Sequence, residues 1–340
     1  MKVALDAQLT VGTATGIGEY VRGLAEALCK RGLDLAVLSE PRLDPWRFDR
    51  RIIWDQLVLP RRARAAGAQI LHCAAGTMPR NAGMPIVVTV HDLAWHAVQS
   101  HAPRYARYYF GDFSLRRYAR ASHVVVDSNF SRDELLRFCP NLDPRRVDVV
   151  YPGVASQFFT LGRAGGDRRT ILTVGTVERR KNLEVLVRAL ADLPDARLVA
   201  VGPQTPYARE CAGLAARLGV ASRVEMRGYV SRPDLLTLYQ DCAVAAVPSR
   251  YEGFGYAAAQ ALCAGVPCVV SERSSLPEVA GGDARVACAD DPKAWVTALS
   301  AALSGEDDAR AARVRAAAVA RFSWEASAAK MERIYASVNR

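Results

Sequence analysis

Short β-branched runs alternate with helix-patterned segments along the whole chain, and the cycle occurs twice. Parallel strands require long crossover connections, usually helices, so this alternation predicts parallel sheets built of strand–helix–strand units. The fold class is therefore α/β, rather than a β-sandwich or a helical bundle. The expected strands are 2–5, 34–38, 70–72, 86–90, 123–126 and 147–150, then 170–174, 197–201, 223–226, 243–247, 267–271 and 285–287.

The segments between these strands have the spacing of amphipathic helices. Two of them carry serine N-cap signals, because Ser131 is followed three residues later by Glu134 and Ser231 by Asp234. Such pairs satisfy the free amides of a helix N-terminus. The expected helices are 19–30, 55–66, 104–120, 132–138, 183–193, 207–218, 233–240, 256–264 and 292–303, with two more between 309 and 339.

A stretch of small and charged residues, 155–169, separates the two cycles and has the composition of a linker. We therefore expect a Rossmann-like, doubly wound domain over 1–155 and a second over 156–322. A C-terminal helix over 323–340 is expected to cross back to the first domain. Two such domains would face a central cleft at the carboxyl ends of their strands, where open α/β sheets bind ligands, with the linker as hinge.

The cysteines, the apolar runs and the net charge limit which kinds of protein the chain can be. The eight cysteines are scattered and no pair has zinc-ligand spacing, so we expect reduced, buried thiols. No apolar run approaches about 18 residues, and an acid at Asp6 breaks the first one, which predicts a cytoplasmic chain. The net charge is +10, with twelve Arg against four acids between Arg47 and Arg120. A phosphate ligand, an anionic lipid surface or nucleic acid would suit that excess, and a solvated arginine-rich face is the alternative.

Several common sites are disfavoured by single residues. Val21 stands where a dinucleotide-binding loop starting at Gly16 needs its third glycine, which argues against a dehydrogenase. Arg180 and Asn182 stand where a P-loop starting at Gly175 needs its second glycine and its Ser or Thr. The sequence contains no nucleophile elbow, zinc-protease helix or EF-hand loop.

Two strand-to-helix junctions are suited to an anion. Gly16-Ile17-Gly18 lets backbone amides approach a phosphate at a helix N-terminus, and a simple turn explains it equally well. Arg179, Arg180 and Lys181 follow a strand, where cations can stabilise a departing diphosphate. A solvated charge run is the alternative for that segment.

A third junction spans 248–261, directly after an apolar strand. It combines Glu252 with Gly253 and Gly255, and it places Gln260 a little over one turn into the following helix. At this spacing the two polar side chains can face one ligand from its two ends. A glycine-rich turn with a capping acid is the alternative.

Together these residues resemble the retaining GT-B glycosyltransferases of family four, which transfer a sugar from a nucleotide diphosphate donor. The resemblance covers essentially the whole chain and is most specific from Ile171 to Glu278. There ILTVGTVERRKNLEVLVRAL is similar to the family's VGT-x-E-x-RKNL segment. The block PSRYEGFGYAAAQALCAGVPCVVSERSSLPEVAGG is similar to its EGFG and LPEV block.

The resemblance implies a role for each matching residue. The catalytic residues would be His91, facing the transferred sugar, Lys181, binding the diphosphate, and Glu252, holding sugar hydroxyls. The residues that bind the nucleotide sugar would be Gly16, Gly18, Thr176, Arg180, Tyr229, Val230, Gly253, Phe254, Gly255 and Gln260. In this set the two N-terminal glycines approach the phosphates, Arg180 helps Lys181, and the loop with Tyr229 holds the base.

Two positions depart from the family pattern. Gln260 replaces the second acid, which accepts hydrogen bonds from the nucleotide ribose, and a neutral amide makes weaker bonds than a carboxylate. Thr176 stands where many relatives have Arg, so the phosphate charge would have to be met by Arg179, Arg180 and Lys181.

The resemblance implies that the chain transfers a hexose with retention. The donor most similar to the family pattern is GDP-mannose. The acceptor would be a glycan or a lipid-linked molecule used in cell-surface polysaccharide such as O-antigen. UDP-sugars and dTDP-rhamnose are alternative donors. No metal or cofactor is expected, and no dedicated base, because a phosphate oxygen can take the acceptor proton. We expect peripheral contact with an anionic membrane and no nucleic-acid partner. A nucleic-acid binder and a non-catalytic nucleotide-sugar binder are the alternatives from other classes.

Overall fold

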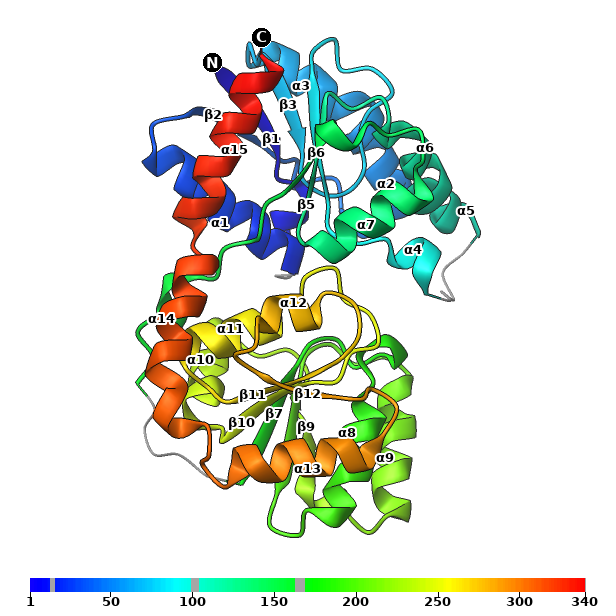
Figure 1. The fold of residues 1–340 in the computed structure, drawn as a ribbon. Coiled ribbons are helices and arrows are strands. Elements are labelled where there is room, and N and C mark those ends of the chain that lie inside the picture. Colours follow the sequence, from blue (N-terminus) through cyan, green and yellow to red (C-terminus); the bar gives the residue numbers. More distant parts are fainter. Residues whose placement is uncertain (13–15, 99–103, 163–168, 340) are drawn as a thin grey trace. The chain divides into compact units, whose positions relative to one another are not determined.

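The computed structural model describes residues 1–12, 16–98, 104–162 and 169–339, which form two compact units (Figure 1). Unit 1 consists of Met1–Gly153 together with Ser323–Arg340, and unit 2 is Val154–Phe322. Each unit is built on a six-stranded parallel sheet. The α/β prediction is therefore confirmed. Every predicted strand is present, with each boundary within one residue of its expected place.

The sheet of unit 1 has the order β2-β1-β3-β4-β5-β6. The chain passes from β1 to β2 on one side and then returns to place β3 on the other, so the topological switch point lies between β1 and β3. The strands are β1 (Lys2–Asp6), β2 (Asp34–Leu38), β3 (Ile70–Cys73), β4 (Ile86–Val90), β5 (His123–Val126) and β6 (Val147–Val149).

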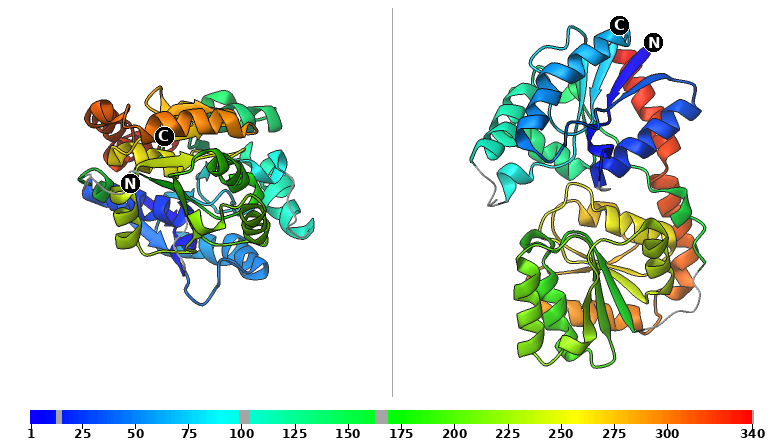
Figure 2. Two further views of the ribbon diagram at one scale, coloured as in Figure 1. Left: turned by 90° about the horizontal axis from the view of Figure 1, so that it is seen from below. Right: turned by 180° about the vertical axis from the view of Figure 1, so that it is seen from behind.

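Helices cover both faces of this sheet because alternate strand residues point to opposite sides. Val3 and Leu5 of β1 pack with the helices α1 and α15, whereas Ala4 joins a second core on the other face. Helix α15 lies beside α1 in both side views (Figures 1 and 2). The helices are α1 (Gly16–Lys30), α2 (Phe48–Ile53), α3 (Leu59–Ala65), α4 (Ala94–Ala97), α5 (Arg104–Arg107), α6 (Ser114–Tyr118), α7 (Asn129–Phe138) and α15 (Trp324–Val338).

Two details of unit 1 differ from the sequence prediction. Helix α7 begins three residues earlier than expected, and its N-cap is Ser128, whose hydroxyl accepts a hydrogen bond from the Ser131 amide at 3.0 Å. The predicted cap at Ser131 is therefore wrong. The expected helices 55–66 and 104–120 are each interrupted by a π-helical turn, over Trp54–Val58 and Tyr108–Phe113.

The sheet of unit 2 has the order β12-β11-β10-β7-β8-β9, with its switch point between β7 and β10. Helices α8, α9 and α13 pack on one face, as the view from behind also shows (Figure 2). The strands are β7 (Thr170–Val174), β8 (Arg197–Val201), β9 (Val224–Met226), β10 (Val244–Val247), β11 (Cys268–Ser271) and β12 (Arg285–Ala287). The helices are α8 (Leu183–Ala189), α9 (Tyr207–Arg217), α10 (Arg232–Asp241), α11 (Tyr256–Ala264), α12 (Leu276–Ala280), α13 (Pro292–Leu303) and α14 (Ala311–Arg321).

The capping predictions for unit 2 are confirmed. Ser231 caps α10 by accepting a hydrogen bond from the Asp234 amide at 3.3 Å, and α11 ends at Gly265 in the left-handed conformation. All eight cysteines are free thiols, and six are buried as predicted, but Cys29 and Cys288 are exposed, so the prediction is wrong for these two. Within the described ranges, no helix is both long and apolar enough to cross a bilayer, and no group of three or more His, Cys, Asp or Glu has the arrangement of a metal site.

Candidate active site

The carboxyl edge of the unit 2 sheet carries the strongest candidate site. Strands β7 and β10 are paired there, and they lie at the switch point, where open α/β sheets bind ligands. The loop after β7 contains Lys181, and the loop after β10 contains Glu252. Thr176 and Lys181 line a small pocket together with the ends of both strands. The fold thus brings two segments that are 71 residues apart to one edge.

Unusual backbone conformations shape the first of these loops. Arg179–Lys181 form a single 3-10 turn, and Asn182 then adopts left-handed angles with φ 57° before α8 begins. Asparagine tolerates this region better than most residues. Its buried side-chain amide donates to the carbonyls of Pro248, at 3.1 Å, and Ala289, at 2.8 Å. Asn182 therefore ties the loop after β7 to the loop after β10, a role that the sequence did not suggest.

Two cations meet the carboxylate of Glu252. The Lys181 Nζ lies 2.5 Å from Glu252 Oε1, and the Arg180 guanidinium lies 3.3 Å from Oε2. Arg180 also pairs with Glu178 at 2.8 Å and donates to the Tyr251 carbonyl at 2.8 Å. Arg180, Lys181 and Glu252 therefore lie together at this edge of the sheet, while their roles toward a ligand stay predictions.

Arg179 does not join this cluster. Its guanidinium pairs with Glu210 of α9 at 2.6 Å and lies over the Tyr207 ring, 5.3 Å from the centroid. The three consecutive cations therefore do not all lie together, because Arg179 points to α9. The reason is geometric, because successive residues of a 3-10 turn point about 120° apart.

Glu252 is only 8% exposed, yet its carboxylate is held in its ionised form. Burial alone would raise the pKa of this carboxyl, but the charges of Lys181 and Arg180 outweigh burial and bring the pKa below its ordinary value. The Ser249 hydroxyl also donates to Oε1 at 2.8 Å. The carboxylate is thus charged and fixed in position without any ligand.

Three further serines fix the backbone around Glu252. The Ser274 hydroxyl accepts from the Glu252 amide at 2.9 Å, and the Ser275 hydroxyl lies 2.9 Å from the carbonyls of both Glu252 and Phe254. Ser271 donates to the carbonyl of Ser249 at 2.6 Å. No role was predicted for these serines, although their position at the end of β11 and between β11 and α12 is a usable signal.

The three predicted residues that follow Glu252 are all buried. Gly255 has φ 94° and caps α11, and a Cβ there would lie 2.6 Å from Leu276, so only glycine fits. Phe254 is buried and packs edge-on against Tyr256 and Phe322. Gly253 lies between Glu252 and Phe254 and is also buried.

Gln260 lies on the inner side of α11. It is buried, and its Oε1 accepts a hydrogen bond from the Tyr239 hydroxyl at 3.3 Å. The oxygen expected to accept from the ribose therefore already has an internal donor. The predicted base-binding loop follows β9, where Tyr229 is 55% exposed and Val230 is half-buried.

Unit 1 contributes the other predicted residues. Gly16 is the exposed first residue of α1, and Gly18, two residues further along, is buried. Both follow β1, at the switch point of this sheet, while the preceding residues 13–15 lie outside the described part of the chain. His91 follows β4 at the same carboxyl edge.

Both ring nitrogens of His91 have acceptors as partners. Nδ1 lies 2.7 Å from the Asp127 carboxylate, and Nε2 lies 2.9 Å from the carbonyl oxygen of Ala74. Burial by itself lowers the pKa of His91, but Asp127 and the Ala74 carbonyl outweigh it, so the net pKa is raised. Burial also raises the pKa of Asp127. The arrangement favours the protonated imidazolium, which donates from both nitrogens.

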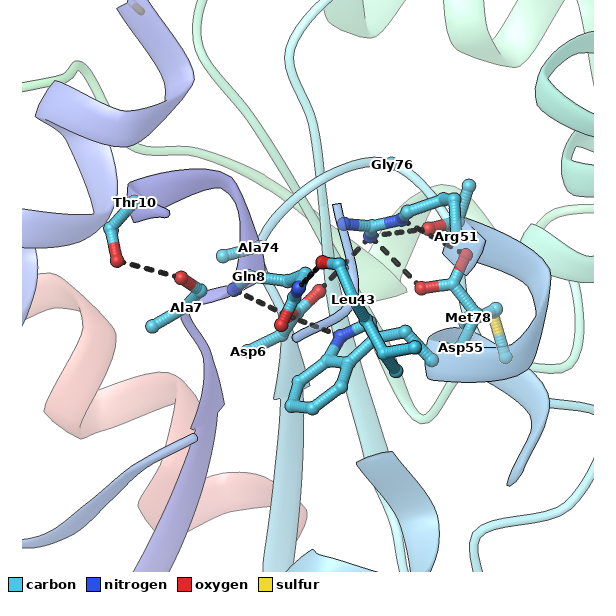
Figure 3. A network of polar contacts seen from close by, with 12 residues as sticks. Asp6, Ala7, Gln8, Thr10, Leu43, Arg51, Asp55, Ala74, Gly76 and Met78 are labelled. Carbon is cyan, nitrogen blue, oxygen red and sulfur yellow. Dashed lines mark hydrogen bonds and ion pairs between the residues drawn. The ribbon is translucent and has the colours of Figure 1, made fainter. Parts of the chain in front are cut away.

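A buried charged network supports the end of β1 in unit 1 (Figure 3). Arg51 pairs with Asp6 at 3.1 Å and with Asp55 at 3.0 Å, and all three are almost completely buried. Asp6 also accepts from the Trp54 indole at 2.9 Å and from the Gln8 amide at 3.0 Å. This network was not predicted, because its members are spread over 50 residues and each alone has the pattern of a surface charge.

Comparison with known proteins assigns the chain to a class. Residues 14–158 match the family model described as Glycosyltransferase Family 4, and residues 159–320 match the model described as Glycosyl transferases group 1. A D-inositol 3-phosphate glycosyltransferase from Mycolicibacterium paratuberculosis is 28% identical over 94% of this chain and 85% of its own length. A protein of the same name from Xylanimonas cellulosilytica is 35% identical over 65% of this chain and 58% of its own.

Solved structures share the fold. Sucrose-phosphate synthase from Thermosynechococcus elongatus superposes with a TM-score of 0.81 at 22% identity, covering 99% of this chain and 98% of that one. Anabaena HepE, solved with UDP-glucose, has a TM-score of 0.74 at 16% identity, covering 99% and 100%. Two doubly wound units with these matches define a glycosyltransferase of the GT-B class. Within that class, the two matches together span residues 14–320 and make the chain a family-4-like glycosyltransferase.

The His91–Asp127 pair should make stability depend on pH. Because its folded-state pKa is raised, His91 stabilises the fold fully below about pH 6.5, its unfolded value, and that contribution is lost as pH rises through the folded-state pKa. The buried His72 is neutral in the fold and loses its proton in the unfolded chain around pH 6.5, so its contribution to the slope is small above about pH 7.5. Asp127→Asn should lower the pKa of His91 and flatten the decline in unfolding free energy between about pH 7 and about pH 9.

Urea unfolding across that range measures the effect. Asp148→Asn is the matched control, because it removes the exposed carboxylate that pairs with His123 at 2.9 Å in the same unit. Its curve should follow that of the unsubstituted chain. An equally steep decline in Asp127→Asn would contradict the assigned charge of His91.

Proposed function

We propose that the chain is a retaining glycosyltransferase that transfers a hexose from a nucleotide diphosphate sugar, with GDP-mannose as the donor and without a metal or cofactor. The observation that carries the proposal is the cluster of Arg180, Lys181 and Glu252 at the switch point of unit 2. Two fixed cations next to a fixed carboxylate suit a ligand that carries both a diphosphate and a hydroxyl-rich ring.

In the proposed reaction the bond between the anomeric carbon and the phosphate oxygen breaks, and its electron pair stays on the departing diphosphate. Lys181 and Arg180 stabilise that developing charge. The acceptor oxygen forms the new bond on the same face of the ring, and its proton goes to a non-bridging phosphate oxygen. Glu252 and His91 orient the sugar, so no side chain has to act as a dedicated base.

The acceptor is proposed to be a glycan or a lipid-linked oligosaccharide used in cell-surface polysaccharide. The names of the relatives favour a second candidate, a phosphorylated polyol such as inositol phosphate. The UDP-glucose complex of HepE similarly favours a UDP-sugar as the second candidate donor. Either donor would use the same cluster in unit 2, because the cluster is proposed to contact the diphosphate and the sugar and not the base. The choice of acceptor does not change this role.

Replacing Lys181 tests the assignment of the leaving-group site. Lys181→Ala should lower kcat by about 10²–10³, since one preorganised donor to the developing charge is lost. Arg179→Ala is the matched control, because Arg179 is two residues away but pairs with Glu210 instead, and its kcat should stay near that of the unsubstituted chain. An unchanged kcat in Lys181→Ala would remove this account of the leaving group.

The stability of the same variant needs a separate measurement. Lys181 neutralises a buried carboxylate, so Lys181→Ala should also cost about 1–3 kcal/mol in unfolding free energy. Adding Glu252→Gln should recover part of that stability without restoring kcat. Chemical unfolding of both variants separates the loss of folded protein from the loss of catalysis.

A panel of nucleotides tests the donor. GDP, UDP, dTDP and ADP are added separately to the full chain, with and without EDTA, and the unfolding midpoint is measured. The preferred nucleotide at about 100 times its dissociation constant should add about 2.7 kcal/mol. GDP is expected to give the largest shift, unchanged by EDTA. A larger shift with UDP would favour the second donor, and a loss of the shift in EDTA would contradict the absence of a metal.

Peripheral membrane contact is proposed for one face of unit 1. Exposed aromatic residues Trp46, Tyr105 and Tyr108 lie close to the exposed arginines 47, 50, 104 and 107. The Phe48 and Tyr105 rings, 4.6 Å apart, join the two segments into one surface. Asp49 is the acid within residues 46–50 and 104–108, so the surface is net positive. Exposed aromatic and basic side chains together suit an anionic lipid headgroup region.

Vesicle flotation tests this surface. The full chain should float with vesicles containing phosphatidylglycerol and not with pure phosphatidylcholine. Combined Trp46→Ala, Tyr105→Ala and Tyr108→Ala should abolish flotation, because the apolar contact is lost while the charge is kept. Val286→Ala, at an exposed apolar position of unit 2, is the control and should float normally. Flotation of the triple variant would contradict the proposal.

A further inference from the structure

We propose that helix α15 positions His91 through Tyr20, by means of a buried chain of hydrogen bonds that runs Tyr335, His72, Thr89, Tyr20. The inference rests on the proposed role of His91 toward the sugar. The four residues of the chain are positioning residues, because their contacts lead to His91 and not to the substrate.

The ring of His91 is held on three sides. Its nitrogens are bonded to Asp127 and to the Ala74 carbonyl, and its ring packs edge-on against Tyr20, with centroids 4.8 Å apart and an interplanar angle of 80°. The Tyr20 side chain is completely buried. The orientation of His91 therefore depends on where the Tyr20 ring stands.

The Tyr20 hydroxyl is the end of a continuous chain across the sheet. It lies 3.1 Å from Thr89 Oγ1 on β4, and Thr89 Oγ1 lies 2.8 Å from His72 Nε2 on β3. The other nitrogen, His72 Nδ1, lies 2.7 Å from the Tyr335 hydroxyl on α15. All four side chains are buried, so water cannot replace a missing partner at low cost.

His72 links Tyr335 to Thr89 in its neutral form. Burial lowers its pKa to about 3, and the charge of His91 lowers it further in the same direction. A neutral imidazole has one donor and one acceptor nitrogen, so the hydrogen bond at Tyr335 determines which nitrogen is left to meet Thr89. Removing the Tyr335 hydroxyl leaves one nitrogen of His72 without its partner. The tautomer of His72 is then no longer fixed, and neither is the hydrogen bond that it makes to Thr89.

Trp324 provides a second contact between α15 and Tyr20. Its indole packs edge-on against the Tyr20 ring, with centroids 5.8 Å apart. The indole occupies space beside Gly23 of α1 and beside Gly153, where any Cβ would collide with it. Helix α15 therefore holds Tyr20 at its ring through Trp324 and at its hydroxyl through Tyr335, and ion pairs from Arg31 to Glu325 and Glu332 hold the helix against α1.

The spectroscopic test follows His91 directly. Histidine side chains labelled with nitrogen-15 are observed by NMR in the full chain, whose five histidines can be assigned by single substitution. Tyr335→Phe should change the His91 resonances and shift its titration midpoint down toward the ordinary histidine value, because a less constrained ring makes weaker bonds to Asp127. Unaltered His91 resonances in Tyr335→Phe would overturn the proposal.

A matched variant controls for the loss of a buried hydroxyl. Tyr118 is also buried in unit 1, and its hydroxyl donates to the Gly76 carbonyl at 2.6 Å instead of joining the hydrogen-bond chain. Tyr118→Phe should leave the His91 titration unchanged. If Tyr335→Phe does not fold, Thr89→Val breaks the chain with a side chain of the same shape, and Thr89→Ser keeps the hydroxyl and should restore the normal titration.

Kinetics separate this inference from the proposed function. Tyr335→Phe and Thr89→Val should lower kcat and shift its pH profile, with little change in KM for the donor, and Thr89→Ser should retain both. His91→Gln should lower kcat at least as much. If His91→Gln is fully active, the proposed role of His91 fails, even where the NMR experiment shows the coupling. If His91→Gln is inactive and the chain variants leave the His91 titration unchanged, the coupling alone fails.

Discussion

The ionised carboxylate of Glu252 determines how the candidate site of unit 2 is built. A charge that is almost fully buried is unstable unless cations and hydrogen bonds compensate for its lost hydration. Lys181, Arg180 and Ser249 supply that compensation. To bring the two cations there, the chain makes a 3-10 turn and then takes left-handed angles at Asn182, whose side chain closes the gap to the neighbouring loop. The cations are therefore already in place before any ligand arrives, which reduces the reorganisation needed during reaction.

Unit 1 meets the same constraint with different residues. Asp6 at the end of β1 is compensated by Arg51, and Asp127 at the end of β5 is compensated by His91. In both units, buried charges with fixed partners thus lie at the carboxyl edge of the sheet. These groups would contribute little to stability compared with apolar side chains of the same size. Their value lies in fixing the orientation of polar groups at the edge where ligands bind.

The strands were predictable because a buried parallel strand is a nearly continuous apolar run with distinct ends, such as 244–247. The π-helical turn at Trp54–Val58 was not, since it keeps the apolar spacing of the surrounding helix. Of the site, the convergence of Arg180, Lys181 and Glu252 followed from family motifs. The direction of Arg179 and the internal hydrogen bond of Gln260 depend on Glu210 and Tyr239, which no motif includes. The His72–Tyr335 bond joins residues 263 positions apart, and no local pattern reports such a pair.

The order of segments along the chain has a consequence for biosynthesis. Unit 2 is continuous from 154 to 322, whereas unit 1 needs residues 323–339 to complete its core, including Ala328, Met331 and Tyr335. During translation, unit 2 can fold as soon as it leaves the ribosome. The sheet of unit 1 is made first. Until α15 emerges, it lacks Tyr335 as a partner for His72 and Trp324 in the space beside Gly23. The nascent chain therefore exposes an apolar face for the whole time that unit 2 is being made, and this face is where a chaperone has most reason to bind.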